Sequence, residues 1–203
     1  SSDEAIATVD QTGKVTGVAE GTAIITAQIG ETVVDTCEVT VTQPAFVTQT
    51  MTIDLGAKDY NIAKLNEAQT TISTFTVGSM EFNGLNVDNN GAVYNYLMLR
   101  NGNSSVLGNT LLSNKTQVPG AITKVEFTIP SGSSGSAIYN AIISATEVTS
   151  KVTDATFTQT GPGTFIVTAD ATANLSYFAI SCVNNDKKNG QVASITVTYV
   201  PAA

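Results

Sequence analysis

The chain has 203 residues, with 17 acidic and nine basic side chains, no histidine, and a net charge of −8 at pH 7. Proteins that bind nucleic acid exchange Lys and Arg for the counterions of the phosphates, so the lack of a basic stripe argues against a nucleic-acid partner. The lack of histidine removes Ser-His-Asp and Cys-His nucleophilic arrangements and the usual zinc sites. No apolar run approaches the ~20 residues of a membrane-spanning helix.

Composition predicts an all-β chain organised in two parts. Only 13% of the residues are charged, and long runs of Leu, Glu, Lys and Ala, which favour helices, do not occur. The acidic excess lies mainly in residues 1–43, where seven carboxylates accompany one lysine, whereas the remainder carries a net charge of −2. A chain of this length suffices for one large or two modest domains, and we expect two.

The first part consists of short alternating segments separated by glycines. These segments are AIATVD (5–10), KVTGV (14–18), TAIITAQI (22–29) and DTCEVTVTQ (35–43). In DQTG (10–13), the aspartate and the glycine occupy positions that a type I turn favours. Pro44 cannot donate to a strand ladder, which predicts a linker over residues 44–49 between a first domain, 1–43, and a second domain, 50–203.

The two cysteines could form a disulfide in a secreted protein. Strand phase argues against this pairing. Cys37 shares a strand face with Val39 and Val41, and Cys182 is in phase with Ile180. We therefore expect two small core residues in different domains rather than a cross-link.

From residue 46 onward the sequence predicts about ten further strands, separated by loops rich in Asn, Gly and Ser. The candidate strands are residues 46–55, 71–77, 79–85, 92–100, 121–130, 136–144, 155–159, 164–170, 175–183 and 191–200. Residues 57–70 have weak helical character, but Asn61 and Asn66 are equally compatible with an irregular loop.

Several of these strands alternate between apolar and polar side chains. Residues 124–129 place Val125, Phe127 and Ile129 on one side and polar residues on the other, and residues 194–199 repeat this pattern. One buried and one solvated face per strand is typical of antiparallel sheets packed face to face. About ten strands in about 150 residues favour a jelly-roll β-sandwich over a seven-stranded immunoglobulin sandwich.

The first 42 residues resemble the bacterial immunoglobulin-like group 2 family. The resemblance rests on SSDEAIATVD at the start, on GKVTG and GTAIITA, and on CEVTV near the end. It implies the carboxy-terminal half of an immunoglobulin-like β-sandwich, whose amino-terminal strands would precede Ser1. About forty residues are at the limit of independent folding, and they would leave an open sheet edge.

Three arrangements could complete this half-domain. It could pack on the second domain, or it could pair with strands of a neighbouring copy of the chain. It could also belong to a longer protein whose upstream part supplies the remaining strands. The last arrangement is the one that we expect.

The second part is similar to jelly-roll modules that follow such immunoglobulin-like repeats in surface proteins of gut Bacteroides and relatives. The segments that carry this resemblance are TIDLGAKDYNIAKLNEAQ (52–69), YLMLRNGNSS (96–105), PGAITKVEFT (119–128), YFAIS (177–181) and NGQVASITVTY (189–199). The resemblance implies a carbohydrate-binding or adhesion domain on a lipid-anchored or secreted protein. Residues 58–61 depart from the Gln-Gly-Tyr-x-Asn turn of the common pattern, so a shared ligand does not follow.

A sugar-binding site needs an aromatic ring against the apolar face of the pyranose and fixed polar groups for its hydroxyls. Tryptophan is absent, but tyrosines in phase lie beside a polar loop and the only arginine, whose guanidinium suits carboxylates or vicinal hydroxyls. The candidate ligand-binding residues are Tyr94, Tyr96, Arg100, Asn101, Asn103, Tyr139 and Asn140. The tyrosines also fit core or rim positions and Arg100 also fits a strand-end salt bridge, so both interpretations stay open.

Other motifs give weaker signals. The loop NVDNNG (86–91) is rich in oxygen ligands, but Asp88 is its only carboxylate, which makes it a weak calcium candidate. The segment SGSSGS (131–136) lacks the Gly-Lys-Ser/Thr ending of a phosphate-binding loop and predicts a flexible turn. No two carboxylates are paired by the sequence as glycoside hydrolysis requires, so we expect neither a catalytic residue nor a cofactor.

These observations favour a non-catalytic adhesion or carbohydrate-binding protein of a bacterial cell surface. The immunoglobulin-like part would be a spacer, and the jelly roll would bind a glycan or a host-surface ligand. The alternative is a structural stalk or assembly subunit whose open immunoglobulin-like edge pairs with another protein. A glycan-active enzyme module is a third, weaker interpretation.

Overall fold

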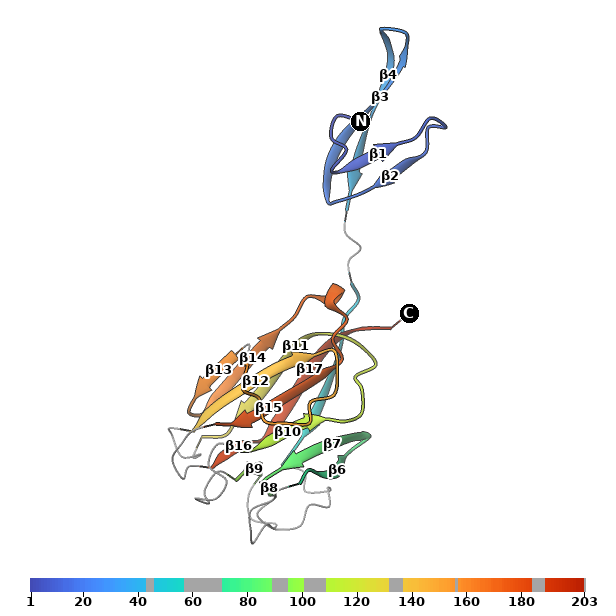
Figure 1. The fold of residues 1–203 in the computed structure, drawn as a ribbon. Helices are drawn as coiled ribbons and strands as arrows, with labels where there is room; N and C mark the ends of the chain where they lie inside the picture. The colour runs from blue at the N-terminus through green and yellow to red at the C-terminus, as the bar shows by residue number, and fades with distance from the viewer. Residues whose placement is uncertain are drawn as a thin grey trace. The chain divides into compact units, whose positions relative to one another are not determined.

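The computed structural model describes residues 1–42, 46–56, 71–88, 95–100, 109–131, 137–155, 157–183 and 189–202, and strands dominate it (Figure 1). In these ranges the helical element is a single 3-10 turn, Ala171–Ala173. The chain divides into two compact units, Ser1–Phe46 (unit 1) and Val47–Ala203 (unit 2). The predicted all-β class is confirmed. Residues 57–70, predicted to be weakly helical or irregular, lie outside the described residues.

The described part of unit 1 is built from two antiparallel pairs of strands. β1 (Ala7–Val9) pairs with β2 (Val15–Gly17), and β3 (Gly21–Ile29) pairs with β4 (Thr32–Val41). The turn predicted at residues 10–13 is present, because the Gly13 N–H donates to the Asp10 carbonyl at 3.0 Å. The Thr12 hydroxyl and the N–H groups of Lys14 and Thr12 donate to the Asp10 carboxylate, and these bonds lower the pKa of Asp10.

Unit 1 buries few apolar side chains. Among its described residues, two alanines are the buried apolar residues, Ala7 and Ala23. Large apolar side chains stay exposed in this unit, namely Val15, Val18, Ile24, Ile29, Val33, Val34 and Phe46. Cys37 is exposed too, so the prediction of a core cysteine was wrong at this position, whereas it is confirmed for the buried Cys182. Cys37 pairs with Ile25 across β3 and β4, and it lines an open hollow with Val9 and Asp10 instead of packing in a core.

Unit 2 is an antiparallel jelly-roll β-sandwich of two large sheets, as predicted (Figure 1). The first sheet has the spatial order β14 (Gly163–Thr168), β11 (Gly120–Ile129), β17 (Ser194–Pro201) and β5 (Gln49–Asp54). The second has the order β13 (Phe157–Thr160), β12 (Ile138–Ser144), β15 (Tyr177–Cys182), β10 (Leu111–Asn114), β7 (Met80–Leu85) and β6 (Ser73–Val77). A small third sheet consists of β16 (Gly190–Val192), β9 (Leu97–Leu99) and β8 (Val87–Asp88).

The main core lies between the two large sheets. Val125, Phe127 and Ile129 of β11 have exposed fractions of 0%, 0% and 2%, which confirms the predicted alternation. The ring of Phe127 stacks on Phe165 of β14 with 5.1 Å between centroids. It also meets Phe178 of the second sheet edge-on at 6.2 Å, so aromatic contacts join the two layers.

A second apolar cluster covers the outer face of the six-stranded sheet. Leu85, Leu111 and Ala179 pack there against Val152, which lies in the connection between β12 and β13. We call residues 145–155 of this connection the strap. The expectation of one solvated face per strand was therefore wrong for these strands. Burial on both faces also explains why β10 was not predicted, since all four residues of Leu111–Asn114 are buried and show no alternation.

Candidate binding site

The small sheet β16-β9-β8 brings residues that are distant in sequence into one row (Figure 1). Its register pairs Gln191 with Met98 and Met98 with Asp88, so these three side chains project from the same face. The flanking residues Leu97 and Leu99 project from the opposite face into the main core. Asp88 has an exposed fraction of 0%, Met98 of 7% and Gln191 of 8%, so two strongly polar side chains are buried in this row.

Arg100 compensates the buried carboxylate of Asp88. It follows β9 directly, and its Nε lies 2.7 Å from Oδ2 of Asp88. The Arg100 N–H donates to the Asn86 carbonyl at 2.7 Å, and Asn86 adopts a left-handed conformation with φ of 52°. The Asn86 amide in turn donates to the Asn109 carbonyl at 2.8 Å. The guanidinium is thus fixed at its base through both its backbone and its Nε, while 34% of the Arg100 side chain remains exposed.

The ion pair disfavours the calcium site considered for Asp88. A guanidinium already neutralises the carboxylate, and a divalent cation would have to displace it. Within the described ranges, no group of three Asp, Glu, Cys or His side chains is arranged to hold a metal ion.

Tyr139 lies beneath the small sheet rather than on a surface. Its exposed fraction is 0%, and its hydroxyl accepts the Gln191 N–H at 2.9 Å. A Cβ on Gly190 would lie 2.8 Å from the Tyr139 ring, so glycine permits this close approach. Burial raises the pKa of Tyr139 far above its usual value, because desolvation penalises the phenolate. The ring predicted to cover a sugar is instead a core residue that holds β16.

We expect Tyr139→Phe to lower the free energy of unfolding by about 1–2 kcal/mol at pH 7, because the Gln191 N–H loses its buried acceptor. The raised pKa of Tyr139 makes the free energy of unfolding depend on pH. Its stabilisation is fully present below a pH of about 10 and is lost as the pH rises above the pKa of the unfolded chain, where the unfolded phenol ionises first. The variant should therefore lose less stability than the wild type between about pH 9 and 11.

Urea unfolding at several pH values measures both effects. Tyr177→Phe, a change at a half-buried tyrosine in the same unit, is the control. An alkaline loss of stability in Tyr139→Phe as steep as in the wild type would contradict the expected buried phenol.

Asn140, the other candidate beside Tyr139, is committed to a structural contact. Its Nδ2 donates to the Val152 carbonyl of the strap at 3.3 Å, and its Oδ1 accepts from Thr158 of β13 at 2.9 Å. The Ser181 hydroxyl accepts the Val152 N–H at 2.9 Å, and Ser113 donates to the Val148 carbonyl at 2.6 Å. Short polar side chains of the sheet thus hold the backbone of the strap, a role that sequence spacing did not reveal.

Only some of the other predicted ligand residues belong to the described part of the structure. Tyr94, Asn101 and Asn103 lie outside the described residues. Tyr96 is half-buried and directly precedes β9, four residues before Arg100. The structure therefore places Arg100 and Asp88 together and Tyr96 on the same segment, but assigns Tyr139 and Asn140 to packing.

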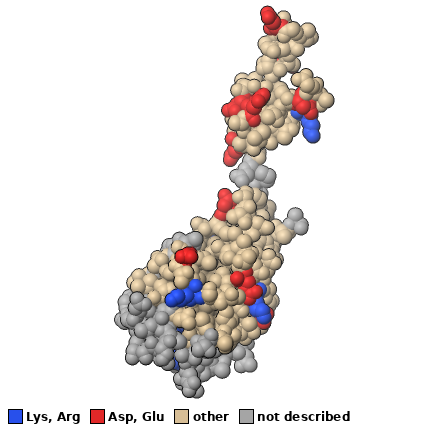
Figure 2. Space-filling view, in the orientation of Figure 1, with Lys and Arg blue, Asp and Glu red and all other residues tan. Residues whose placement is uncertain are grey.

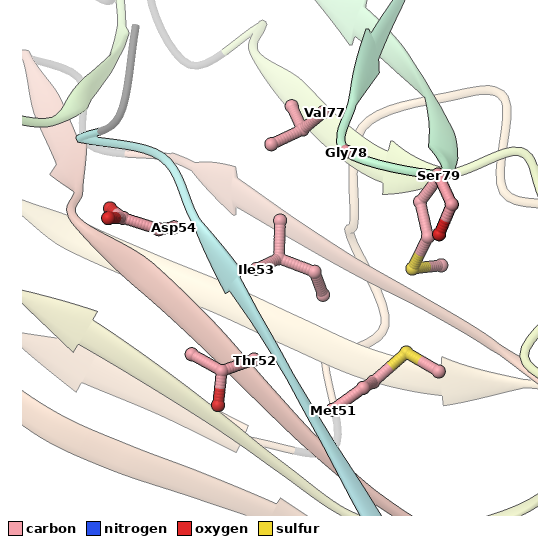
Figure 3. Close-up of a pocket in the computed structure, with 8 residues that line it drawn as sticks. Met51, Thr52, Ile53, Asp54, Val77, Gly78 and Ser79 are labelled. Atoms are coloured by element: carbon pink, nitrogen blue, oxygen red, sulfur yellow. The ribbon is translucent and has the colours of Figure 1, made fainter. Parts of the chain in front are cut away.

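Two hollows along β5 were not predicted from the sequence. The first, of about 320 Å³, lies between β5 and the β6–β7 turn and is drawn in Figure 3. Its lining residues are Met51, Thr52, Ile53, Asp54, Val77, Gly78, Ser79 and Met80. The second, of about 530 Å³, shares Thr52 and Asp54 and is completed by Gly56, Asn95, Ala193 and Ser194. No motif marks these residues, because each hollow is lined by segments that are distant in sequence.

Residues 1–41 match the family model of the bacterial Ig-like domain (group 2). The resemblance of this part of the chain is thereby confirmed, while the match leaves unit 2 unassigned. No curated protein matches the chain. No helix within the described residues is long and apolar enough to span a membrane.

Two solved structures are similar to the chain at low identity. The K2 cleaved adhesin domain of Lys-gingipain shares 15% identity at a TM-score of 0.38, over 73% of this chain and 88% of that one. The low-affinity xylan-binding module CBM86 of the gut symbiont Roseburia intestinalis shares 10% identity at a TM-score of 0.32, over 74% of this chain and 94% of that one. Both scores are low, so the function has to be inferred from the residues of this chain.

Proposed function

We propose that unit 2 is a non-catalytic glycan-binding domain of a bacterial cell-surface protein, and that Arg100 makes its principal polar contact. The observation that carries this proposal is the Arg100–Asp88 pair. A fully buried carboxylate holds the guanidinium at the end of β9 while a third of the arginine side chain, 34%, stays accessible. Tyr94, Tyr96, Asn101 and Asn103 remain proposed ligand contacts around it.

The chemistry of a held guanidinium suits a sugar ligand. Arginine has five N–H donors, and the bond to Asp88 uses the Nε–H, which leaves the two terminal nitrogens for a carboxylate or a pair of vicinal hydroxyls. Because the side chain is already fixed, binding costs less conformational entropy than at a free arginine. Unit 2 has ten acidic and eight basic residues, so its net charge opposes an acidic sugar only weakly.

The proposed setting is extracellular. Unit 1 would be a bacterial Ig-like spacer, supported by the family match over residues 1–41, and the protein would be lipid-anchored on a Bacteroides-type surface. Figure 2 shows the acidic side chains that gather on the visible face of unit 1. Such a surface repels anionic polymers, and this favours a spacer over a second ligand-binding part.

A glycan array with neutral, uronic-acid-terminated and sialic-acid-terminated oligosaccharides tests the proposal, followed by calorimetric titration of the strongest ligand. We expect Arg100→Ala to weaken binding about tenfold or more, and Arg100→Lys to weaken it too, because lysine cannot form the bidentate contact. Lys115→Ala is a matched control, since Lys115 also pairs with a carboxylate, Glu81, at 3.1 Å and has a side chain that is 39% exposed. No binding to any glycan, or equal affinities for wild type and Arg100→Ala, would refute the proposal.

A second candidate function rests on a different observation, the exposed apolar side chains of unit 1. Six of them, Val15, Val18, Ile24, Ile29, Val33 and Val34, have exposed fractions between 39% and 74%. An assembly subunit would pair this surface with another protein. Light scattering distinguishes the two functions, because an oligomer that depends on concentration and disappears when residues 1–43 are deleted supports assembly.

A further inference from the structure

We propose that the outer edge of β5 receives an extended peptide strand from a partner protein, in which apolar side chains alternate with basic ones. The proposal concerns a different part of unit 2 from the Arg100–Asp88 pair and shares no residue with it.

One side of β5 pairs with no strand among the described residues. β5 is the last strand of its sheet, and its other side pairs with β17 in an antiparallel register from Gln49–Tyr199 to Asp54–Ser194. The Leu55 N–H donates to the Ala193 carbonyl at 2.9 Å, so alternate residues from Leu55 back to Met51 direct their backbone groups toward β17. The N–H and C=O groups of Thr50 and Thr52 then point to the outer edge, where no strand of the described residues pairs with them.

β5 also lacks the features that usually protect an edge strand. Natural edge strands are shielded by lysine, proline or a β-bulge. Gln49–Asp54 has the sequence QTMTID, and its register with β17 is continuous. Within the described residues, the edge of β5 can therefore accept an added strand.

The first hollow would accept the inward side chains of an added strand. It separates the edges of the two large sheets, and its apolar lining comes from Met51 and Ile53 on β5 and from Val77 and Met80 at the β6–β7 turn. Figure 3 shows Ile53 pointing toward the Val77 side of this hollow. Ile53, Val77 and Met80 are each 6% exposed, so the hollow opens directly onto the main core.

The second hollow would accept the outward side chains. It is lined by Thr52 and Asp54, two outward residues of β5, together with Gly56, Asn95, Ala193 and Ser194. Successive residues of a strand project to opposite faces of a sheet, so a strand beside β5 would place its side chains alternately toward the apolar residues of the first hollow and toward the face that carries Thr52 and Asp54. An extended peptide whose side chains alternate with a two-residue period could therefore contact both hollows.

Charge selects basic residues for the polar positions of that peptide. Asp54 is exposed, and one of its oxygens, Oδ1, accepts the Gly56 N–H at 2.8 Å. Among the described residues, neither hollow is lined by a lysine or an arginine. A lysine or arginine on the outward face of the added strand would meet the exposed Asp54 carboxylate.

The test uses the full chain and a capped synthetic peptide in which valine and lysine alternate. Amide hydrogen exchange, followed by NMR, should slow about tenfold or more at Thr50 and Thr52 when the peptide is added. A control peptide of the same composition, with the valines and the lysines in two separate blocks, should leave both amides unchanged. Equal protection by the two peptides, or protection that appears on other strands, would overturn the proposal.

Two charge variants separate specific pairing from attraction to an acidic protein. Asp54→Lys should weaken peptide binding about tenfold or more, whereas Asp154→Lys, an equal charge change at an exposed residue of the strap, should have little effect. Equal losses in both variants would refute the role of Asp54. Thr52→Pro removes an outward N–H without a partner in β17 and should abolish binding; if it does not fold, the exchange data on the wild type decide.

The occupant could also be a second copy of the chain, and light scattering tests this. One outcome would overturn the proposal that a different protein pairs with β5. It is slow amide exchange at Thr50 and Thr52 without peptide, together with a dimer that Asp54→Lys dissociates. A monomer under the same conditions supports it.

Discussion

Replacing Phe127 by alanine is expected to lower the free energy of unfolding of unit 2 by about 3–5 kcal/mol. Phe127 is fully buried and makes ring contacts with Phe165 of its own sheet at 5.1 Å and with Phe178 of the opposite sheet at 6.2 Å. The substitution would leave a cavity at the centre of the sandwich, and β-strands on either side cannot collapse into it without breaking their ladders.

Intrinsic tyrosine fluorescence during urea unfolding measures this loss. All six tyrosines lie in unit 2, so the signal reports this unit without a contribution from unit 1. Ile166→Ala is the control, because Ile166 lies on β14 next to Phe165 but is 43% exposed. A loss for Phe127→Ala no larger than for Ile166→Ala would show that the two sheets do not share this core.

Gly120→Ala is expected to destabilise unit 2 by about 2–4 kcal/mol, although it adds a single methyl group. Gly120 starts β11 with a φ of 157°, and a Cβ there would clash with the Val200 carbonyl oxygen and lie 2.8 Å from Cα of Pro201. The obstacle is the backbone of the paired strand β17, which cannot move away without disturbing the register of the two central strands.

Gly163→Ala provides the matched comparison for this effect. Gly163 also has a positive φ, 130°, but a Cβ at that position meets nothing within 4 Å. We expect this variant to lose only the ~1–2 kcal/mol that the conformational strain costs. Equal losses in the two variants, measured by the same urea titration, would show that the contact with β17 does not contribute.

Periodicity was sufficient to predict the sandwich of unit 2 because its first sheet has one solvated and one buried face. The alternation of Val125, Phe127 and Ile129 depends only on the geometry of a single strand, so it is visible without any knowledge of the partner strands. The same reasoning failed for β10 and for the outer face of β7. There the strap covers the second face, and burial on both sides removes the pattern.

Strand phase also has a limit in unit 1. It correctly grouped Cys37 with Val39, which both lie on the β3–β4 pair opposite Ile25 and Ala23. It could not determine whether a second layer covers that face, and Cys37 is exposed. Phase determines which residues share a side, whereas burial depends on what packs against that side.

The candidate site was predicted in part for a similar reason. Arg100 and Asp88 were each singled out, one as a ligand contact and one as a weak calcium candidate, but nothing in their spacing showed that they form one ion pair at 2.7 Å. The burial of Tyr139 depends on its contact with β16, and the contact of Asn140 depends on how the strap folds back over the sheet. Such contacts follow from the packing of separate segments, which the hydrophobic period of one segment does not show.

The sequence by itself determined the all-β class, the turn at residues 10–13, the immunoglobulin-like character of residues 1–41 and the inward residues of β11. These properties follow from dihedral preferences and from a two-residue period, which act over a few neighbouring positions. Only the tertiary structure decided which faces are covered, which charges meet and which strand edge stays open. Those features arise where strands from distant parts of the chain approach one another. The clearest case is β5, which pairs with β17 and lines a hollow with the β6–β7 turn.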